Sequence, residues 1–191
     1  MNRHHTLAWF AFSVATPALV GPASAQFPTP EVPKSEPEYI AKAKTAAPEA
    51  IVDKATIVMM QGDGSSKTLQ TGSNGFTCMV TSDGTPACAD ANGMEWFKAI
   101  ETKAAPPDKT GFIYMMAGDT GTSNHDPYAT DKTHWVQTGP HVMIVGKAAR
   151  EMVGLYPKTM DPDPSQPYVM FPGTPYEHLM LPVHSQQAAT R

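Results

Sequence analysis

Two stretches of this sequence, GPHVMIVG (139–146) and TPYEHLMLPV (174–183), share one arrangement: a histidine, an apolar residue, a methionine and further aliphatic residues. Short apolar runs between turn residues are typical of β-strands. Because strand side chains alternate between the two faces of a sheet, His141 and His178 each share a face with the methionine two residues later. These two strands decide the fold, and their mixed face is the first place to look for a functional site.

The second stretch separates its two faces most clearly. His178 and Met180 lie on one face, and the other face carries only aliphatic side chains: Leu179, Leu181 and Val183. We therefore expect the aliphatic faces to lie in the core and the His/Met faces to be directed toward something else.

The arrangement belongs to a wider pattern of an apolar residue, a methionine, an apolar residue, any residue and a glycine. Four runs fit it: VMMQG (58–62), YMMAG (114–118), VMIVG (142–146) and VMFPG (169–173). The residues on the methionine face, two positions earlier, are Ile57, Ile113, His141 and Tyr168. Each run predicts a strand that ends in a glycine turn, and the irregular spacing argues against a repeat fold.

Helices are expected in two places. Residues 36–47 have apolar side chains at helical spacing up to Pro48, and residues 48–55 add another turn. Residues 90–107 form the clearest helix, with an N-cap at Asp90 or Asn92 and an end at two prolines. Together with the strands, these segments predict an α+β fold: a mixed, mainly antiparallel sheet or small barrel with two or three helices.

The N-terminus indicates export. A short basic region is followed by the apolar stretch LAWFAFSVATPALV and by GPASA, which has small residues at the positions of a cleavage site. The apolar stretch is shorter than the ~20 residues that span a bilayer. We therefore expect a signal peptide over residues 1–25 and no membrane anchor after processing. Residues 26–37 are proline-rich and expected to be extended, and residues 38–191 to form a single globular domain, periplasmic or secreted.

Cys78 and Cys88 are the only cysteines, and two turn signals lie between them. In an oxidising compartment we expect them to form a local disulfide. A thiolate metal pair or a redox couple is the alternative, and the absence of a C-x-x-C spacing disfavours it.

The charge of the chain excludes some partners. The formal net charge is −4 and becomes −5 without the signal peptide, where Arg3 is the only charged side chain. No run of Lys and Arg remains, so we expect neither nucleic acid nor an anionic membrane as a partner, but a small molecule or a metal ion. Phosphate-loop, nucleophile-elbow, zinc-protease and dinucleotide-binding signatures are all missing from the sequence.

The histidines allow a structural and a chemical interpretation. Buried imidazoles need partners, so both could be structural, each bonded to a backbone carbonyl or a tyrosine. They could instead serve as acid and base in a pocket with the polar loop of residues 118–135, which also supplies Asp119 and His125. The candidate catalytic residues are His141, His178, Tyr128, Tyr176 and Asp126, and the candidate ligand-binding residues are Asn124, Trp135 and Glu177.

A metal site is the third interpretation. Imidazole and thioether together suit copper, and the thioether favours Cu(I). The candidate ligands are His141, His178, Met143 and Met180, in a chain with 12 methionines. Zinc or iron held by His134, His141 and His178 is a weaker variant. Against copper, methionine also fills irregular cores.

At NGFTCM (74–79), NGMEW (92–96), SNHDPYAT (123–130), GPHVMIVG and GTPYEHLM the chain resembles a family of uncharacterised exported bacterial proteins. The resemblance extends over residues 55–183 and implies export and a single domain, but no activity.

The residues themselves predict a small-molecule enzyme or binding protein with a His/Tyr pocket. A periplasmic copper-binding protein and a structural or interaction domain are the alternatives.

Overall fold

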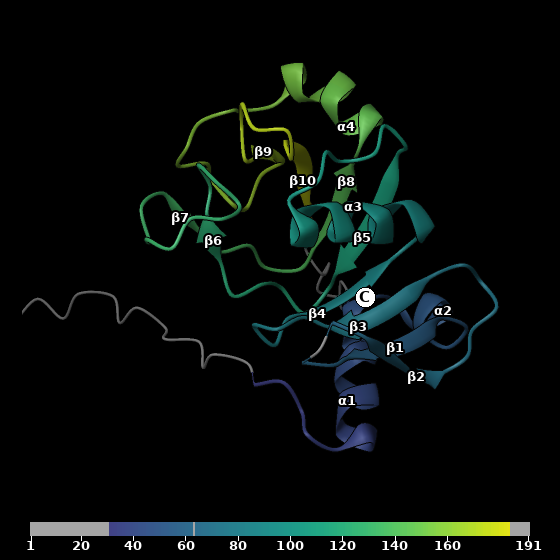
Figure 1. Ribbon diagram of the computed structural model, residues 1–191. Helices are drawn as coiled ribbons and strands as arrows, with labels where there is room; N and C mark the ends of the chain where they lie inside the picture. The colour runs from purple at the N-terminus through teal and green to yellow at the C-terminus, as the bar shows by residue number, and fades with distance from the viewer. Residues whose placement is uncertain (1–30, 63, 184–191) are drawn as a thin grey trace, which may run out of the picture.

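Eight strands form one open sheet in the order β2-β1-β3-β4-β5-β8-β10-β9, as the computed structural model shows (Figure 1). The structure describes residues 31–62 and 64–183, so the expected signal peptide lies outside the described residues. The strands of this sheet are β1 (Thr56–Met60), β2 (Ser66–Gln70), β3 (Thr77–Val80), β4 (Pro86–Ala89), β5 (Gly111–Met115), β8 (His141–Val145), β9 (Tyr168–Met170) and β10 (His178–Pro182). A separate ribbon pairs β6 (Thr122–Ser123) with β7 (Trp135–Val136).

The sheet is mixed and mainly antiparallel, as predicted. Only β1 and β3 pair in parallel, and β2 and β9 are the edges of a sheet that does not close into a barrel. All four apolar-methionine-glycine runs form strands: β1, β5, β8 and β9. Three of their glycines, Gly118, Gly146 and Gly173, have a positive φ angle, which other residues rarely adopt.

Within residues 31–62 and 64–183, four α-helices accompany the sheet, one more than the upper limit expected. They are α1 (Glu36–Ala43), α2 (Glu49–Val52), α3 (Ala91–Thr102) and α4 (Lys147–Met152), with the short 3₁₀ segments η1 (Lys44–Ala46) and η2 (Val153–Leu155). Helix α4 was not predicted, because it is short, follows β8 after a single glycine and has no side-chain cap. No helix within the described ranges is long and apolar enough to cross a membrane.

The cap of α3 is Asp90, one of the two residues predicted. The Gly93 N–H donates to Asp90 Oδ1 at 2.7 Å. The helix ends at Thr102, before the prolines, where Lys103 takes a left-handed conformation. Two glycines allow α3 to lie against β5, because a Cβ on Gly111 would be 2.4 Å from the Gly93 nitrogen. This contact places α3 over one face of the sheet.

The two faces of the sheet have separate cores. Ala87 and Ala89 of β4 pack into a cluster with Trp96 of α3, whereas Cys88 between them packs into a cluster with Tyr39 of α1. Since neighbouring residues of a strand point to opposite faces, α1 and α3 cover opposite sides of the sheet. In Figure 1 α1 lies below β3 at the lower end of the molecule, and α3 lies beside β5 in its central part.

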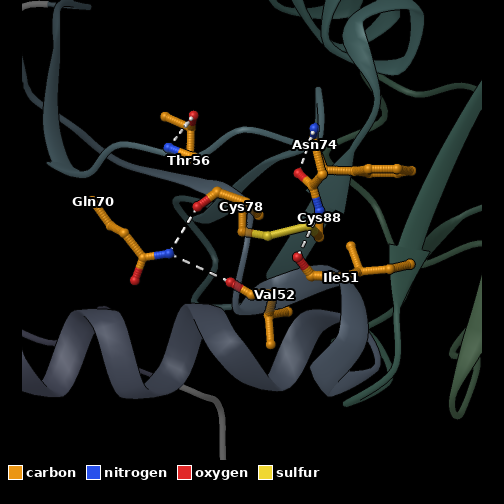
Figure 2. Close-up of a disulfide and its surroundings, with 10 residues drawn as sticks. Ile51, Val52, Thr56, Gln70, Asn74, Cys78 and Cys88 are labelled. Atoms are coloured by element: carbon orange, nitrogen blue, oxygen red, sulfur yellow. Dashed lines mark hydrogen bonds between the residues drawn. A yellow bond between two sulfur atoms is a disulfide. The ribbon is translucent and has the colours of Figure 1, made fainter.

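The predicted disulfide joins Cys78 of β3 to Cys88 of β4, with an S–S distance of 2.08 Å (Figure 2). The two cysteines are direct partners across the hairpin. Polar side chains around it bind backbone carbonyls, and Figure 2 shows Asn74 Nδ2 donating to Ile51 O at 2.8 Å. The disulfide and these bonds fix the layer that contains α1 and α2.

Candidate functional site

The His/Met face of β8 and β10 is the core face, so the expectation that it is directed elsewhere is wrong. Met143 and Met180 are direct partners across the two strands, and both pack in the cluster around Trp96. His141 and His178 are fully buried on the same face. The reason lies in the tertiary structure, because α3 packs over this face of the sheet. The alternation of side chains along a strand shows which residues share a face but not which face a distant helix will cover.

Both histidines have the same local arrangement. Nδ1 of His141 lies 2.7 Å from Gly139 O, and Nδ1 of His178 lies 2.9 Å from Tyr176 O. A carbonyl oxygen can only accept, so each Nδ1 carries a proton and donates it. Each Nε2 is then an acceptor with a lone pair, and both Nε2 atoms are buried without a hydrogen-bond partner. The structural interpretation of these histidines therefore explains Nδ1 of each ring, which has a backbone partner, but not Nε2, which has none.

The two imidazoles lie at opposite ends of the strand pair. His141 pairs with Pro182, which lies four residues beyond His178 on β10. At ~3.3 Å per residue the backbone positions are ~13 Å apart along the strand. Each ring leans toward the carbonyl two residues before it, and because the strands are antiparallel these carbonyls lie in opposite directions. Each ring thus has its own backbone partner, and the two rings still lie close enough for the charge of His141 to act on His178.

This geometry bears on the metal interpretations. Of the four proposed copper ligands, only Met143 and Met180 are brought side by side. His134, a proposed zinc or iron ligand, binds Asp161 at 2.9 Å and takes no part in either histidine environment. Across the part of the chain that the structure describes, no group of three or more His, Cys, Asp or Glu side chains could hold a metal ion.

His178 lies among aromatic rings. Its ring centroid is 4.9 Å from that of Trp96 and 5.6 Å from that of Phe171. Burial lowers the pKa of His178 to about 4, the bond to Tyr176 O acts in the opposite direction, and the nearby His141 lowers it further. His178 is therefore neutral near pH 7, although the charge of the neighbouring Glu177 also acts to raise its pKa.

His141 faces a carboxylate. Its Nε2 lies 3.9 Å from Oδ2 of Asp119, whose side chain is 14% exposed while that of His141 is 0% exposed. Burial lowers the pKa of His141 and raises the pKa of Asp119 to about 6. Although the distance would suit an ion pair, near pH 7 the imidazole is neutral and the carboxylate is charged, so two acceptors face each other with no donor between them.

The backbone holds Asp119 in place. Its Oδ1 accepts from Gly121 N–H and from Thr138 N–H, each at 2.9 Å, and its own N–H donates to Thr138 O at 3.0 Å. The turn that permits this contact uses Gly118 at φ +78°, where a Cβ would lie 3.1 Å from Thr138 O. Oδ2 lies toward His141, and a hydrogen bond from the Thr138 side chain also stabilises the carboxylate.

Further polar groups surround this carboxylate. Tyr168 OH and Thr138 Oγ1 share a hydrogen bond of 2.7 Å, and the charge of Asp119 contributes to a raised pKa of Tyr168, after burial. Asp83 binds the Thr120 hydroxyl, and its charge helps to raise the pKa of Asp119. We call Asp119, Thr138, His141 and Tyr168 the acceptor site.

The acceptor site differs from the predicted residue set. Of the predicted catalytic residues it includes only His141. Asp119 appeared in the sequence analysis only as one of several polar loop residues, and Tyr168 only as a strand-face residue. The available signal was the position of each: Asp119 directly follows the glycine that ends the β5 run, and Tyr168 occupies the place equivalent to His141 in its own run.

The predicted tyrosines lie at the C-terminal end of α3. Tyr128 OH donates to Ile100 O at 2.8 Å, and Tyr176 OH donates to Ala104 O at 2.7 Å. Asp126 Oδ1 accepts from the Tyr128 N–H at 2.9 Å, which closes a tight turn. These contacts satisfy carbonyls at a helix end, and they place none of the three side chains beside His141.

The predicted ligand-binding residues also make internal contacts. Asn124 binds Thr159 O, Met160 O and the Phe171 N–H, all within 3.2 Å. Glu177 pairs with Lys158 at 3.1 Å, and Trp135 lies on the surface under the ammonium group of Lys132. A pocket shared by His141 and His178 was also expected; a groove of about 260 Å³ among the described residues lies instead along α3 and the segment after it, near Glu95 and Pro107.

Comparison with known proteins gives no further guide, because no protein family, curated protein or solved structure matches this chain.

Proposed function

We propose that this chain is an exported small-molecule enzyme or binding protein whose site is the acceptor site at the start of β8. The observation that carries the proposal is the buried lone pair on Nε2 of His141, 3.9 Å from Asp119 Oδ2. A buried acceptor without a donor costs free energy, about 1–3 kcal/mol. Such a cost beside a carboxylate that is partly accessible to solvent is typical of a site that a ligand completes.

The chemistry available to the site is proton acceptance. With Nδ1 held as a donor by Gly139 O, His141 presents Nε2 as the basic nitrogen. Asp119 stabilises the positive charge that develops on the His141 ring when Nε2 accepts the proton of a donor. The hydroxyl pair of Tyr168 and Thr138 lies next to them as a further hydrogen-bonding group. A ligand with an N–H or O–H group would be oriented, and deprotonated where its acidity allows.

A ligand screen on the mature chain, residues 26–191, tests the proposal. Small polar molecules would be scored by the rise in melting temperature that they cause, which reports binding to the folded state. The expected result is a set of compounds whose effect is lost in His141→Gln and kept in His134→Gln, the surface control. Binding that survives both His141→Gln and Asp119→Asn, or no binding by any compound, would contradict the proposal.

Copper remains the second candidate because Met143 and Met180 lie side by side in a buried layer. Cu(I) belongs in the same screen, with the double variant Met143→Leu/Met180→Leu. Leucine nearly preserves volume and apolarity, so the variant should fold. Stabilisation by Cu(I) that disappears in this variant would favour a copper-binding protein over the acceptor site. If neither a small molecule nor Cu(I) binds, the remaining candidate is a structural or interaction domain.

The proposed location outside the cytoplasm is supported by the disulfide, which persists in oxidising compartments. Fractionation of cells that express the full chain should find the protein in the periplasm or the medium, with Gln26 as its first residue. A chain that remains cytoplasmic with its N-terminus intact would contradict this part of the proposal.

A further inference from the structure

We infer that the group that completes the acceptor site is the terminal ammonium of a small amine. This inference rests on the proposed function and names its ligand class. It follows from three observations taken in turn: the hydrogen-bonding capacity of the site, its charge, and its access to solvent.

The hydrogen-bonding capacity is that of an acceptor pair. The Nε2 atom of His141 holds a lone pair, and Oδ2 of Asp119 faces it at 3.9 Å, while Oδ1 is already bonded to two backbone N–H groups. A single donor atom with two or more hydrogens can bind both acceptors at ordinary hydrogen-bond lengths. An ammonium group has three such hydrogens, whereas an anion or a carbonyl has none.

The charge around the site is negative and unbalanced. Asp119 and the nearby Asp83 are both carboxylates, and Asp83 contributes to the raised pKa of Asp119. Within the described ranges, 31–62 and 64–183, no lysine or arginine forms an ion pair with Asp83 or Asp119. The other titratable groups beside Asp119 in the described residues are His141, which is neutral near pH 7, and Tyr168, and the Thr138 side chain is a neutral hydrogen-bond donor. A cation therefore gains free energy at this position that a neutral donor does not.

The burial of the site allows only a small terminal group of a ligand to reach the two acceptor atoms. His141 is fully buried, and the Asp119 side chain is 14% exposed, so the site is reached past the carboxylate. No cluster of three His, Cys, Asp or Glu ligands exists in the described ranges, which disfavours a metal cation. A terminal ammonium can enter beside Asp119 while the rest of the amine stays toward solvent.

The test uses methylammonium chloride as the probe with the mature chain at pH 7.5 and constant ionic strength. Binding is followed by the ¹⁵N resonance of His141 Nε2 and by the melting temperature. The expected result is a saturable change in that resonance together with a higher melting temperature. Tetramethylammonium, a cation without N–H groups, should do neither, and acetamide, a neutral donor, should bind at least about tenfold more weakly.

Variants and pH give the matched controls. Asp119→Asn should weaken methylammonium binding by about tenfold or more, because it removes the charge and keeps the shape. Asp161→Asn, which alters an exposed carboxylate paired with His134, should not change it. Binding to the parent protein should also weaken below about pH 6, where Asp119 takes up a proton. Equal binding by Asp119→Asn, or equal binding of tetramethylammonium, would overturn the inference.

The same experiment separates this inference from the proposed function. If acetamide changes the His141 resonance and methylammonium does not, the ligand is a neutral donor: the inference is wrong and the proposed function stands. If neither probe affects His141 and no compound from the screen depends on it, both are wrong.

Discussion

Asp119 lies in an environment that is unusual for a carboxylate. Its carboxylate is largely buried, accepts two backbone hydrogen bonds on Oδ1 and faces the lone pair of His141 with Oδ2. Burial raises its pKa to about 6 despite those bonds. A buried charge opposite a buried acceptor destabilises the fold near neutral pH, and residues kept at such a cost are often functional.

Replacing this carboxylate should therefore stabilise the protein. Asp119→Asn keeps an oxygen for the N–H groups of Gly121 and Thr138, and its amide can donate to His141 Nε2. The pKa of about 6 lies above the ordinary value of 3.8, so the native state holds the proton more tightly and stability falls as pH rises from about 4 to 6. At pH 7.5 the variant should gain up to ~2–3 kcal/mol in free energy of unfolding.

Urea denaturation at pH 7.5 and at pH 4 measures this effect. The gain should be present at pH 7.5 and largely absent at pH 4, where native Asp119 is protonated. Asp161→Asn serves as the exposed control and should change stability little, because it lies in a surface pair. An Asp119→Asn protein no more stable than the parent at pH 7.5 would contradict the assignment of a desolvated charge.

His178 should produce a pH dependence of the opposite sign. Burial lowers its pKa to about 4, so between pH 6.5 and pH 4 the unfolded chain binds a proton that the native state does not. Stability is then complete above pH 6.5 and falls as pH decreases, by up to roughly 3 kcal/mol from this residue. His178→Leu should flatten the stability profile between pH 6.5 and pH 4. An unchanged slope, measured by urea denaturation across that range, would show that His178 does not titrate as its burial requires.

At the scale of elements, the hairpin of β3 and β4 joins the two cores. Val80 of β3 exchanges two hydrogen bonds with Tyr39 OH of α1, at 2.9 and 3.1 Å. Cys78 and Cys88 link the two strands on the α1 side, while Ala87 and Ala89 contact the cluster under α3. The disulfide thus strengthens the element on which both helical layers depend.

Removing the disulfide should cost up to ~3 kcal/mol, the value expected for a short closed loop. The change is Cys78→Ala/Cys88→Ala, and the measurement is the free energy of unfolding by denaturant. Thiol counting on denatured, unreduced parent protein should find no free thiol. Two free thiols, or a double variant as stable as the parent, would show that the bond is not formed or does not constrain the unfolded chain.

At the scale of the whole molecule, the fold is one sheet with a core on each side. Since β4 contributes alternate residues to both cores, neither should unfold alone. The Trp135→Phe mature chain leaves Trp96 as its only tryptophan and reports on the core under α3. Its fluorescence and the hydrogen exchange of the Val80 amide should give the same free energy of unfolding. Two separate transitions would show that the cores are independent.

Local sequence was sufficient for the strands of the four methionine runs and of residues 174–183, for the helix cap and for the disulfide. The glycine turns, the Asp90 cap and the cysteine hairpin each depend on residues a few positions apart, and each is confirmed. The methionine pattern also indicated which residues share a face. Helix α4 was missed because its six residues carry neither a cap nor a full amphipathic period.

The site itself depended on tertiary structure. Alternation within β8 and β10 determined that His141 and Met143 share a face, but the packing of α3 decided that this face is the core. Likewise, the sequence showed Asp119 only as a polar loop residue, and the backbone bonds to Gly121 and Thr138 decided that its carboxylate faces His141. Periodicity is a property of neighbouring residues, so the sequence alone determines which side chains share a face. Burial and pKa depend on which distant segments pack at the same point, so only the tertiary structure decides them.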